Sequence, residues 1–334
     1  MPERIRLAVL GLGFMGQRYA TIAADVAGAE LTAVCDADEQ LAQQTAQRCG
    51  AAAYSDVRQL LDADVADAVI VALPESVQVA PAVATAGAGL HLLLEKPVAS
   101  TAADLDQLAA GLAGTPGVHA SAHLLRADPR YAAATDAVHA DDFGSIVHIT
   151  TVRRSRLQTA HRVAGRTSLL YYLGVHDLDA VAWFADSPVR SVHAVSTRPA
   201  DWPLDVDATI LALLECANGA VAQVELTWAL ADGRPHGLQA STVVVGTGGT
   251  VEIRGGDEVL VAGGRGQQAA DALHWPEVGG RVLGTLRYQV EQWVAAIAGR
   301  GRVAATIEDG MAAARVAFAI EESLRTGQRA QVAR

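Results

Sequence analysis

The segment "RIRLAVLGLGFMGQRYATIAADVAG" at residues 4–28 constrains the fold of this chain more than any other feature. An apolar run of strand length leads into "GLGFMG", where Gly11, Gly13 and Gly16 have GxGxxG spacing, and a helical pattern follows. In such a unit the first glycine permits a tight turn, the second lets backbone approach a pyrophosphate, and the third allows close helix–strand packing. The helix N-terminus then offers N–H groups to the phosphates. We therefore expect the start of a dinucleotide-binding domain.

A glycine-rich turn alone is weak support, and the next strand strengthens it. "ELTAVCDAD" ends in Asp36, whose carboxylate can accept hydrogen bonds from both hydroxyls of an adenosine ribose. No arginine follows closely in "ADEQLAQ", so a 2′-phosphate would meet a negative charge without a cation. The sequence therefore predicts NAD in preference to NADP. The alternative role for Asp36 is a helix N-cap, for which Asp38 is better placed.

Two further runs, "ADAVIVALP" and "LHLLLEKP", have the continuous apolar character of parallel strands that helices cover on both faces. Strands alternating with helices predict a doubly wound sheet, in which ligands bind at the carboxyl ends of the strands. The candidate cofactor-binding residues are Gly11, Gly13, Phe14, Met15, Gly16, Asp36, Leu73, Pro74, Glu95 and Lys96.

Lys96 is the single lysine of the chain, beside 25 arginines. A lysine can pass a proton if burial lowers its pKa, whereas an arginine stays protonated. The proline that follows pushes Lys96 towards the extended region. We also expect a cis Lys96–Pro97 bond, since a tight turn there would aim the side chain at the nicotinamide.

Three features together, "GLGFMG", "EKP" and "GVHDLD" at 174–179, resemble the Gfo/Idh/MocA family of NAD(P)-dependent sugar and cyclitol oxidoreductases. The resemblance covers nearly the whole chain, including "IEDGMAAARVAFAIEESLRTGQ", which is similar to the family's C-terminal helix. It implies a second domain with a large open sheet, one face of which often serves for oligomerisation.

The domain organisation predicted is a Rossmann domain at 1–122 and an α+β substrate-binding and oligomerisation domain at 123–334. Strand-rich segments such as "DATILALLECANGAVAQVELTWAL", with "NG" as a hairpin signal, predict a large open, mostly antiparallel sheet in the second domain. Its uncovered face would be a large apolar patch, so we expect a homodimer or homotetramer.

The resemblance implies that Lys96 and His176 flank the nicotinamide and the reacting carbon. A histidine suits the proton that leaves a hydroxyl on oxidation. Asp179, one helical turn after His176, is implied to orient the structure or the cofactor end, and we include it among the substrate-site candidates. Many family members carry an aspartate four residues before the histidine, where this chain has Tyr172. That tyrosine either donates a hydrogen bond or proton or packs against substrate, which leaves ketone reduction open as the physiological direction.

An arginine cluster in "TTVRRSRLQTAHRVAGR" precedes the histidine segment. On a strand Arg154 and Arg156 share one face and Arg153 takes the other. The functional interpretation is capture of a substrate carboxylate or phosphate by Arg154 or Arg156, and the alternative is a solvated or interface strand. Asp177 is expected to be a surface or first-turn residue.

Composition and charge exclude several classes of protein. The net charge of −11 argues against a nucleic-acid binder, and no apolar run is long enough to span a bilayer. The three cysteines form no CxxC pair and the N-terminus has no signal-peptide pattern, so we expect a cytoplasmic protein. "HASAH", with His119 and His123, has metal-like spacing but no third ligand in view, so no metal is expected.

The leading hypothesis is an NAD-dependent oxidoreductase that transfers hydride between the nicotinamide and a secondary alcohol or ketone of a sugar, sugar acid or cyclitol, the substrate being anionic if the arginines bind it. One alternative is an NAD-dependent glycosidase of the same family, which works by transient oxidation and elimination. The other is a dinucleotide-binding regulator without catalysis.

Overall fold

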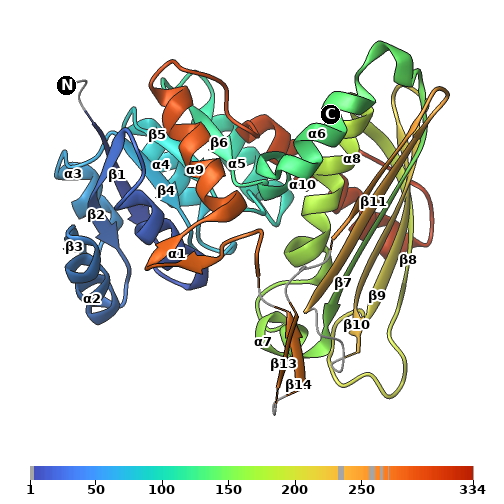
Figure 1. The fold of residues 1–334 in the computed structure, drawn as a ribbon, viewed down its shortest axis with the longest axis horizontal. Coiled ribbons are helices and arrows are strands. Elements are labelled where there is room, and N and C mark those ends of the chain that lie inside the picture. Colours follow the sequence, from blue (N-terminus) through green and yellow to red (C-terminus); the bar gives the residue numbers. More distant parts are fainter. Residues whose placement is uncertain (1–3, 232–236, 256–259, 264–265, 270, 334) are drawn as a thin grey trace. The chain divides into compact units, whose positions relative to one another are not determined.

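The computed structural model describes residues 4–231, 237–255, 260–263, 266–269 and 271–333 (Figure 1). The chain divides into two compact units. Unit 1 comprises Met1–Ala127 and Leu273–Met311, and unit 2 comprises Asp128–Ala272 and Ala312–Arg334. The sequence predicts one division, after residue 122, whereas in the structure the later segment Leu273–Met311 also belongs to the first unit.

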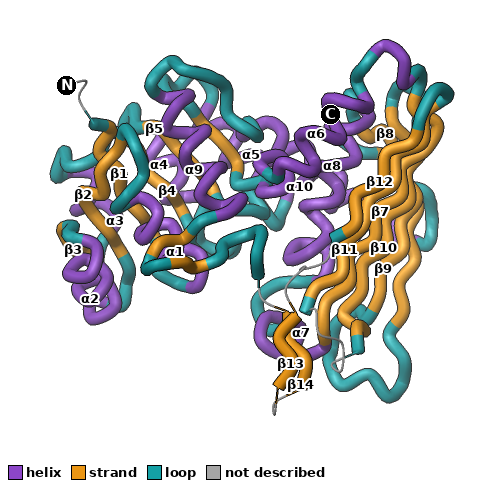
Figure 2. Tube along the Cα trace, viewed as in Figure 1, coloured by secondary structure: helices purple, strands orange, loops and turns teal. Residues whose placement is uncertain are grey.

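Unit 1 contains a six-stranded parallel sheet with strand order β3-β2-β1-β4-β5-β6, which confirms the predicted doubly wound Rossmann fold (Figure 2). Its strands are β1 (Ile5–Leu10), β2 (Ala29–Cys35), β3 (Ala52–Tyr54), β4 (Ala68–Val71), β5 (His91–Leu94) and β6 (His119–Ser121). Its helices include α1 (Phe14–Ala23), α2 (Glu39–Cys49), α3 (Val57–Asp62), α4 (Val79–Gly87), α5 (Ala102–Leu112), a 3-10 turn at Leu124–Ala127, and α9 (Gly284–Ile297). A short hairpin pairs β15 (Glu277–Val278) with β16 (Arg281–Val282).

The central strands β1 and β4 are buried on both faces. Leu7 and Val9 of β1 and Ile70 of β4 are fully buried and belong to one apolar cluster with residues of α1 and α9. This burial explains why these strands read as continuous apolar runs instead of alternating patterns.

Helix α9 is the reason that residues 273–311 belong to unit 1. Leu286, Val290, Trp293 and Val294 follow one another at helical spacing, and all four are buried in the same cluster as Tyr19 of α1. An apolar stripe of this kind stabilises the fold only where it meets another apolar surface, and here that surface is the Rossmann core.

Unit 2 contains a seven-stranded sheet with strand order β12-β11-β7-β10-β9-β8-β17. All neighbours are antiparallel except β7 and β10, which confirms the predicted mostly antiparallel sheet. Its strands are β7 (Ile146–Arg156), β8 (Val189–Thr197), β9 (Thr209–Cys216), β10 (Val221–Leu230), β11 (Leu238–Gly246), β12 (Thr250–Arg254) and β17 (Ala330–Gln331), and β13 (Leu260–Gly263) pairs separately with β14 (Gly266–Ala269). Its helical segments are α6 (Pro129–Val138), a 3-10 turn at Asp141–Phe143, α7 (Leu157–Val163), a π-helical segment at Leu170–Gly174, α8 (Val175–Ala185) and most of α10 (Ile307–Thr326).

The "NG" signal is the turn of the β9–β10 hairpin. Gly219 has φ +94°, a backbone conformation that glycine adopts without strain, and the Asn218 side chain accepts the Ala220 N–H at 3.1 Å. The pairing of Thr209 with Thr227 through Val221 with Glu215 extends from this turn.

The two faces of the unit 2 sheet differ. Helices α6, α8 and α10 lie along one face (Figure 1). On the other face, neighbouring strands carry exposed apolar side chains, which are Val195, Leu211, Leu213 and Val221. None of the helices described is both long enough and apolar enough to cross a membrane.

Candidate functional site

The glycine turn of unit 1 has the geometry that a dinucleotide needs. Gly11 has φ +84°, and a Cβ there would lie 2.6 Å from the Ala72 carbonyl oxygen, while a Cβ at Gly16 would lie 1.8 Å from the Gly11 oxygen. Gly13 is different, because a Cβ there would meet no described atom within 4 Å. Gly13 is the N-cap of α1, and no described side chain caps that helix. The turn is therefore packed tightly at Gly11 and Gly16 and has open space beside Gly13, which fits a pyrophosphate.

The Asp36 carboxylate is held at the end of β2. Its Oδ2 accepts the Leu12 N–H at 2.6 Å, and its Oδ1 accepts the Asp38 N–H at 2.9 Å. Asp38 is the N-cap of α2, where it accepts the Leu41 N–H. Asp36 thus spans the glycine turn and the start of α2, and each oxygen keeps a lone pair for a ribose hydroxyl.

A cavity of about 390 Å³ opens beside Asp36 and is lined in part by Gly11, Leu73 and Arg58. Arg58 is not among the residues predicted from the sequence, because it does not directly follow Asp36 in the chain. The parallel pairing of Cys35 with Tyr54 brings the start of α3, and with it Arg58, to the same strand end. A basic residue after the third strand is the signal that could have identified it.

Lys96 follows β5, and the Lys96–Pro97 bond is cis, as expected. The Lys96 N–H donates to Glu95 Oε2 at 2.9 Å, and Glu95 Oε1 accepts the Tyr19 hydroxyl at 2.7 Å. Burial raises the pKa of the Glu95 carboxyl, and the neighbouring Lys96 charge offsets part of that rise. Glu95 was a cofactor-binding candidate, but its carboxylate lies in the core of unit 1.

Three of the predicted residues of unit 2 lie on the π-helical segment and on α8. Tyr172 and His176 are partly exposed and are spaced one helical turn apart, and Asp179, a further turn on, is buried. The Tyr172 ring packs against Trp228 of β10, with ring centroids 5.5 Å apart. π-helical turns occur frequently at functional sites, which supports this position for a reactive side chain.

A buried ion pair fixes the first turn of α8 to the sheet. Arg153 Nε donates to Asp177 Oδ2 at 2.6 Å and its Nη2 to Oδ1 at 3.1 Å, and both side chains are almost fully buried. Of the two expectations for Asp177, a first-turn position in the helix is confirmed and a surface position is wrong, because α8 turns this side chain towards β7. Asp177 follows His176 directly, so the pair also anchors the backbone of the candidate base.

Arg154 lies on the opposite face of β7 from Arg153, as strand alternation requires. Its Nε donates to Glu225 Oε1 of β10 at 2.5 Å. This placement, away from α8, disfavours Arg154 as a substrate ligand beside His176. Arg156 is the last residue of β7 and the N-cap of α7, and its role stays a prediction.

The histidines of "HASAH" take part in separate contacts. His119 Nε2 lies 3.0 Å from Thr115 Oγ1, and His123 Nδ1 lies 3.0 Å from Ser121 Oγ. Within the described ranges, no cluster of three or more His, Cys, Asp or Glu side chains is arranged to hold a metal ion.

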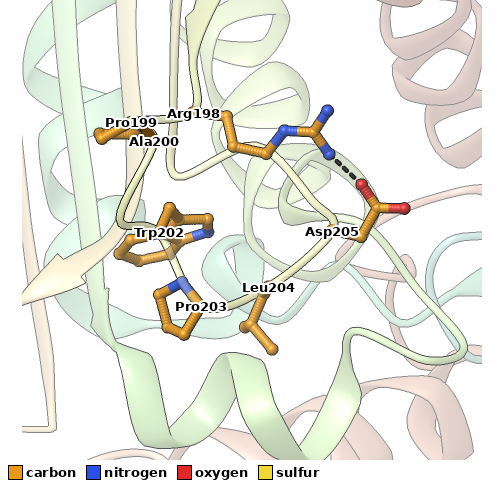
Figure 3. Close-up of a pocket in the computed structure, with 7 residues that line it drawn as sticks. All are labelled: Arg198, Pro199, Ala200, Trp202, Pro203, Leu204 and Asp205. Carbon is orange, nitrogen blue, oxygen red and sulfur yellow. Dashed lines mark hydrogen bonds and ion pairs between the residues drawn. The ribbon is translucent and has the colours of Figure 1, made fainter.

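A second hollow, also about 390 Å³, lies in the loop between β8 and β9 (Figure 3). Trp202, Pro203 and Leu204 line it, and Arg198 and Asp205 form an ion pair at its side. It contains none of the candidate site residues, so we do not assign it to the site.

Comparison with known proteins agrees with these features. The family model described as "Oxidoreductase family, NAD-binding Rossmann fold" matches residues 5–121, and that of the "GFO/IDH/MocA C-terminal domain" matches residues 131–252. The chain is 29% identical to inositol 2-dehydrogenase 1 of Saccharopolyspora erythraea, over 98% of this chain and 96% of that one.

Solved structures share the fold. The myo-inositol 2-dehydrogenase from Lactobacillus plantarum superposes with a TM-score of 0.85 at 21% identity, covering 99% of this chain and 100% of that one. The scyllo-inositol dehydrogenase from Lactobacillus casei, with bound NAD(H) and scyllo-inositol, gives 0.83 at 20% identity and the same coverage. With both family models matched in order along the sequence, this chain belongs to the Gfo/Idh/MocA oxidoreductase family.

Proposed function

We propose that the protein is an NAD-dependent dehydrogenase that interconverts a secondary hydroxyl and a ketone on a cyclitol or a related sugar. The observation that carries this proposal is the arrangement of the glycine turn at residues 11–16 and the Asp36 carboxylate, which we call the dinucleotide cradle. The open space beside Gly13 and the carboxylate follow neighbouring strands of the sheet. The names of the relatives, which are inositol 2-dehydrogenases, support a cyclitol as the substrate class.

The residues of unit 1 fit the cofactor. The α1 N-terminus would hold the pyrophosphate, and Asp36 would bind the adenosine ribose. When bound, NAD⁺ supplies the hydride acceptor. Lys96, at the carboxyl end of β5, would donate to the substrate oxygen, stabilise the charge that develops on it and take part in the transfer of its proton, which an arginine could not do.

The residues of unit 2 would accept the proton of the substrate hydroxyl. Oxidation of an alcohol releases the hydroxyl proton, and His176 is the candidate general base. Tyr172 stands one turn before it and carries no charge at neutral pH, so it would act as a hydrogen-bond donor or pack against the substrate ring. A hydroxyl donor there also serves the reverse direction, in which the ketone oxygen must gain a proton.

An activity assay tests the proposal directly. Purified protein with NAD⁺ should form NADH with at least one member of a panel of inositols, other polyols, sugars and uronic acids. Release of an aglycone from glycosides without net NADH would instead favour the glycosidase. Tight dinucleotide binding without turnover of any compound in either direction would favour the regulator.

We expect NAD to bind more tightly than NADP, and Asp36→Ala to reverse or abolish that preference. Losing one hydrogen bond to a charged group costs about 1.5 kcal/mol or more, so NAD should bind roughly 10-fold more weakly. NADP should bind better, because Arg58 then faces a 2′-phosphate without an opposing carboxylate. Calorimetric titration of both cofactors measures the two effects.

Asp38→Ala is the matched control for that experiment. It removes the neighbouring carboxylate, which caps α2, and should lower stability by roughly 1 kcal/mol without changing the cofactor preference. Equal or tighter binding of NADP by the unaltered protein would contradict the proposed role of Asp36.

We further expect a dimer or tetramer that buries the open face of the unit 2 sheet. Leu213 is 59% exposed, and its neighbours across β8 and β10 are His193 and Gln223. Leu213→Glu should place charges at the centre of the contact and shift the protein towards monomer in sedimentation velocity. Val278→Glu, at a valine that is 58% exposed in unit 1, should not. A monomeric unaltered protein at micromolar concentration would refute the expectation.

A further inference from the structure

Two buried side chains hold the backbone on either side of Lys96. Glu95 Oε2 accepts the Lys96 N–H at 2.9 Å, and the Gln78 side-chain amide donates to the Pro97 carbonyl oxygen. Gln78 is 1% exposed and Glu95 is 8% exposed, so water has little access to either side chain. The Lys96–Pro97 dipeptide is therefore fixed at its first N–H and at its last carbonyl.

The Glu95 carboxylate is itself held by a residue of α1. Its Oε1 accepts the hydroxyl of Tyr19, which is fully buried on α1, and that hydroxyl also lies 3.4 Å from Gln289 Oε1 on α9. A carboxylate that is bonded through both oxygens in a buried site has little freedom to move. The position of the Lys96 backbone is thus tied to α1, the helix whose N-terminus forms part of the dinucleotide cradle.

Gln78 lowers the stability of the fold relative to an apolar side chain at the same position. Its Oε1 is buried and has no hydrogen-bond partner among the described residues. A buried amide with one unsatisfied atom costs stability that an apolar side chain of similar shape would not. What Gln78 contributes is therefore its bond to Pro97.

We propose that Gln78 and Glu95 are positioning residues that hold the Lys96–Pro97 segment from both sides and so aim the Lys96 ammonium group at the substrate. The consequence for turnover rests on the proposed dehydrogenase function. The consequence for the position of Lys96 does not, and it can be measured without substrate.

Because Lys96 is the single lysine, its side chain can be observed selectively. Reductive methylation with ¹³C-formaldehyde labels only Lys96 and the N-terminal amine, and the Lys96→Arg protein assigns the two resonances. Gln78→Met keeps the length of the side chain and removes the N–H donor. We expect the Lys96 resonance and its titration midpoint to shift in Gln78→Met, and kcat of the unlabelled enzyme to fall on the order of 10-fold, as for a small misplacement of a catalytic group.

Thr85→Val is the matched control. Thr85 is fully buried on α4, the helix that Gln78 precedes, and its hydroxyl donates to the Pro81 carbonyl oxygen of the same helix at 2.9 Å. Its Lys96 resonance, titration midpoint and kcat should match those of the unaltered protein. The dissociation constant for NAD should stay within about twofold in both variants, since neither side chain belongs to the cradle.

Glu95→Gln provides a second test if Gln78→Met does not fold. It keeps one acceptor oxygen and the size of the side chain but cannot accept through both ends, so the Lys96 resonance should shift again. Unchanged Lys96 resonances in both variants would overturn the proposal, whatever the activity. Shifted resonances in a protein that oxidises none of the panel compounds would leave the positioning role intact and refute the dehydrogenase function instead.

Discussion

Lys96→Arg should retain the fold and NAD binding but lose most of kcat, on the order of 10²-fold or more, as when a general acid–base group is removed. Arginine keeps the positive charge and a similar reach, but its guanidinium does not give up a proton near neutral pH. A chain with 25 arginines would meet a need for charge alone with another arginine. Circular dichroism, NAD titration and steady-state kinetics on the substrate found in the panel measure the three quantities.

Arg48→Lys is the control for this substitution. Arg48 is exposed near the end of α2, so the exchange of the same two side chains there should change none of the three quantities. Near-normal kcat in Lys96→Arg would mean that position 96 requires only a positive charge, and the proposed proton transfer by Lys96 would have to be abandoned.

The second large effect concerns the buried pair Arg153–Asp177. Asp177→Leu should lower the free energy of unfolding by about 3–5 kcal/mol, because it leaves a buried guanidinium that cannot lose its proton. The double variant Arg153→Met/Asp177→Leu should recover most of that loss, since both charges are then gone. Urea unfolding monitored by tryptophan fluorescence measures the free energy of unfolding of the unaltered protein, of Asp177→Leu and of the double variant.

Arg153→Met should lower the free energy of unfolding less than Asp177→Leu does, and the size of this loss should depend on pH. Burial raises the pKa of the Asp177 carboxyl, and the charge of Arg153 offsets part of that rise. Without Arg153 the folded-state pKa rises further above the unfolded value, so the folded protein binds the extra proton. The contribution of the Asp177 carboxyl to the free energy of unfolding of Arg153→Met is then fully present at pH values below its pKa in the unfolded chain. It is lost as the pH rises through its pKa in the folded protein. The loss relative to the unaltered protein should be larger at pH 7 than at pH 4.5.

Arg154→Met is the control on the same strand. Its ion pair with Glu225 is partly exposed, with 36% of the Arg154 side chain accessible, and such pairs contribute about 0–1 kcal/mol. If Asp177→Leu cost no more than Arg154→Met, the buried pair would not be what anchors α8.

Features that depend on residues close together in the chain were predictable from the sequence. The strand, glycine turn and helix of residues 4–28 specify one local geometry, since only glycine fits where a Cβ would meet the Ala72 or Gly11 oxygen. The position of Asp36 at a strand end and the "NG" hairpin follow from the same kind of local rule. The doubly wound and open-sheet folds then follow from the order of strands and helices along the chain.

Features that depend on which segments meet were decided only by the tertiary structure. Arg58 reaches the Asp36 cavity through strand pairing, and α9 returns to the Rossmann core because its apolar stripe is buried there. In the sequence, Asp177 cannot be distinguished from other acidic residues on helices. Only the packing of α8 on β7 makes it the counter-charge of Arg153. Gln78 carries no sequence signal, yet its amide reaches Pro97 across the fold. A side chain's type limits the bonds it can form, but burial and its neighbours decide which of those bonds exist, and both arise only when distant segments pack together.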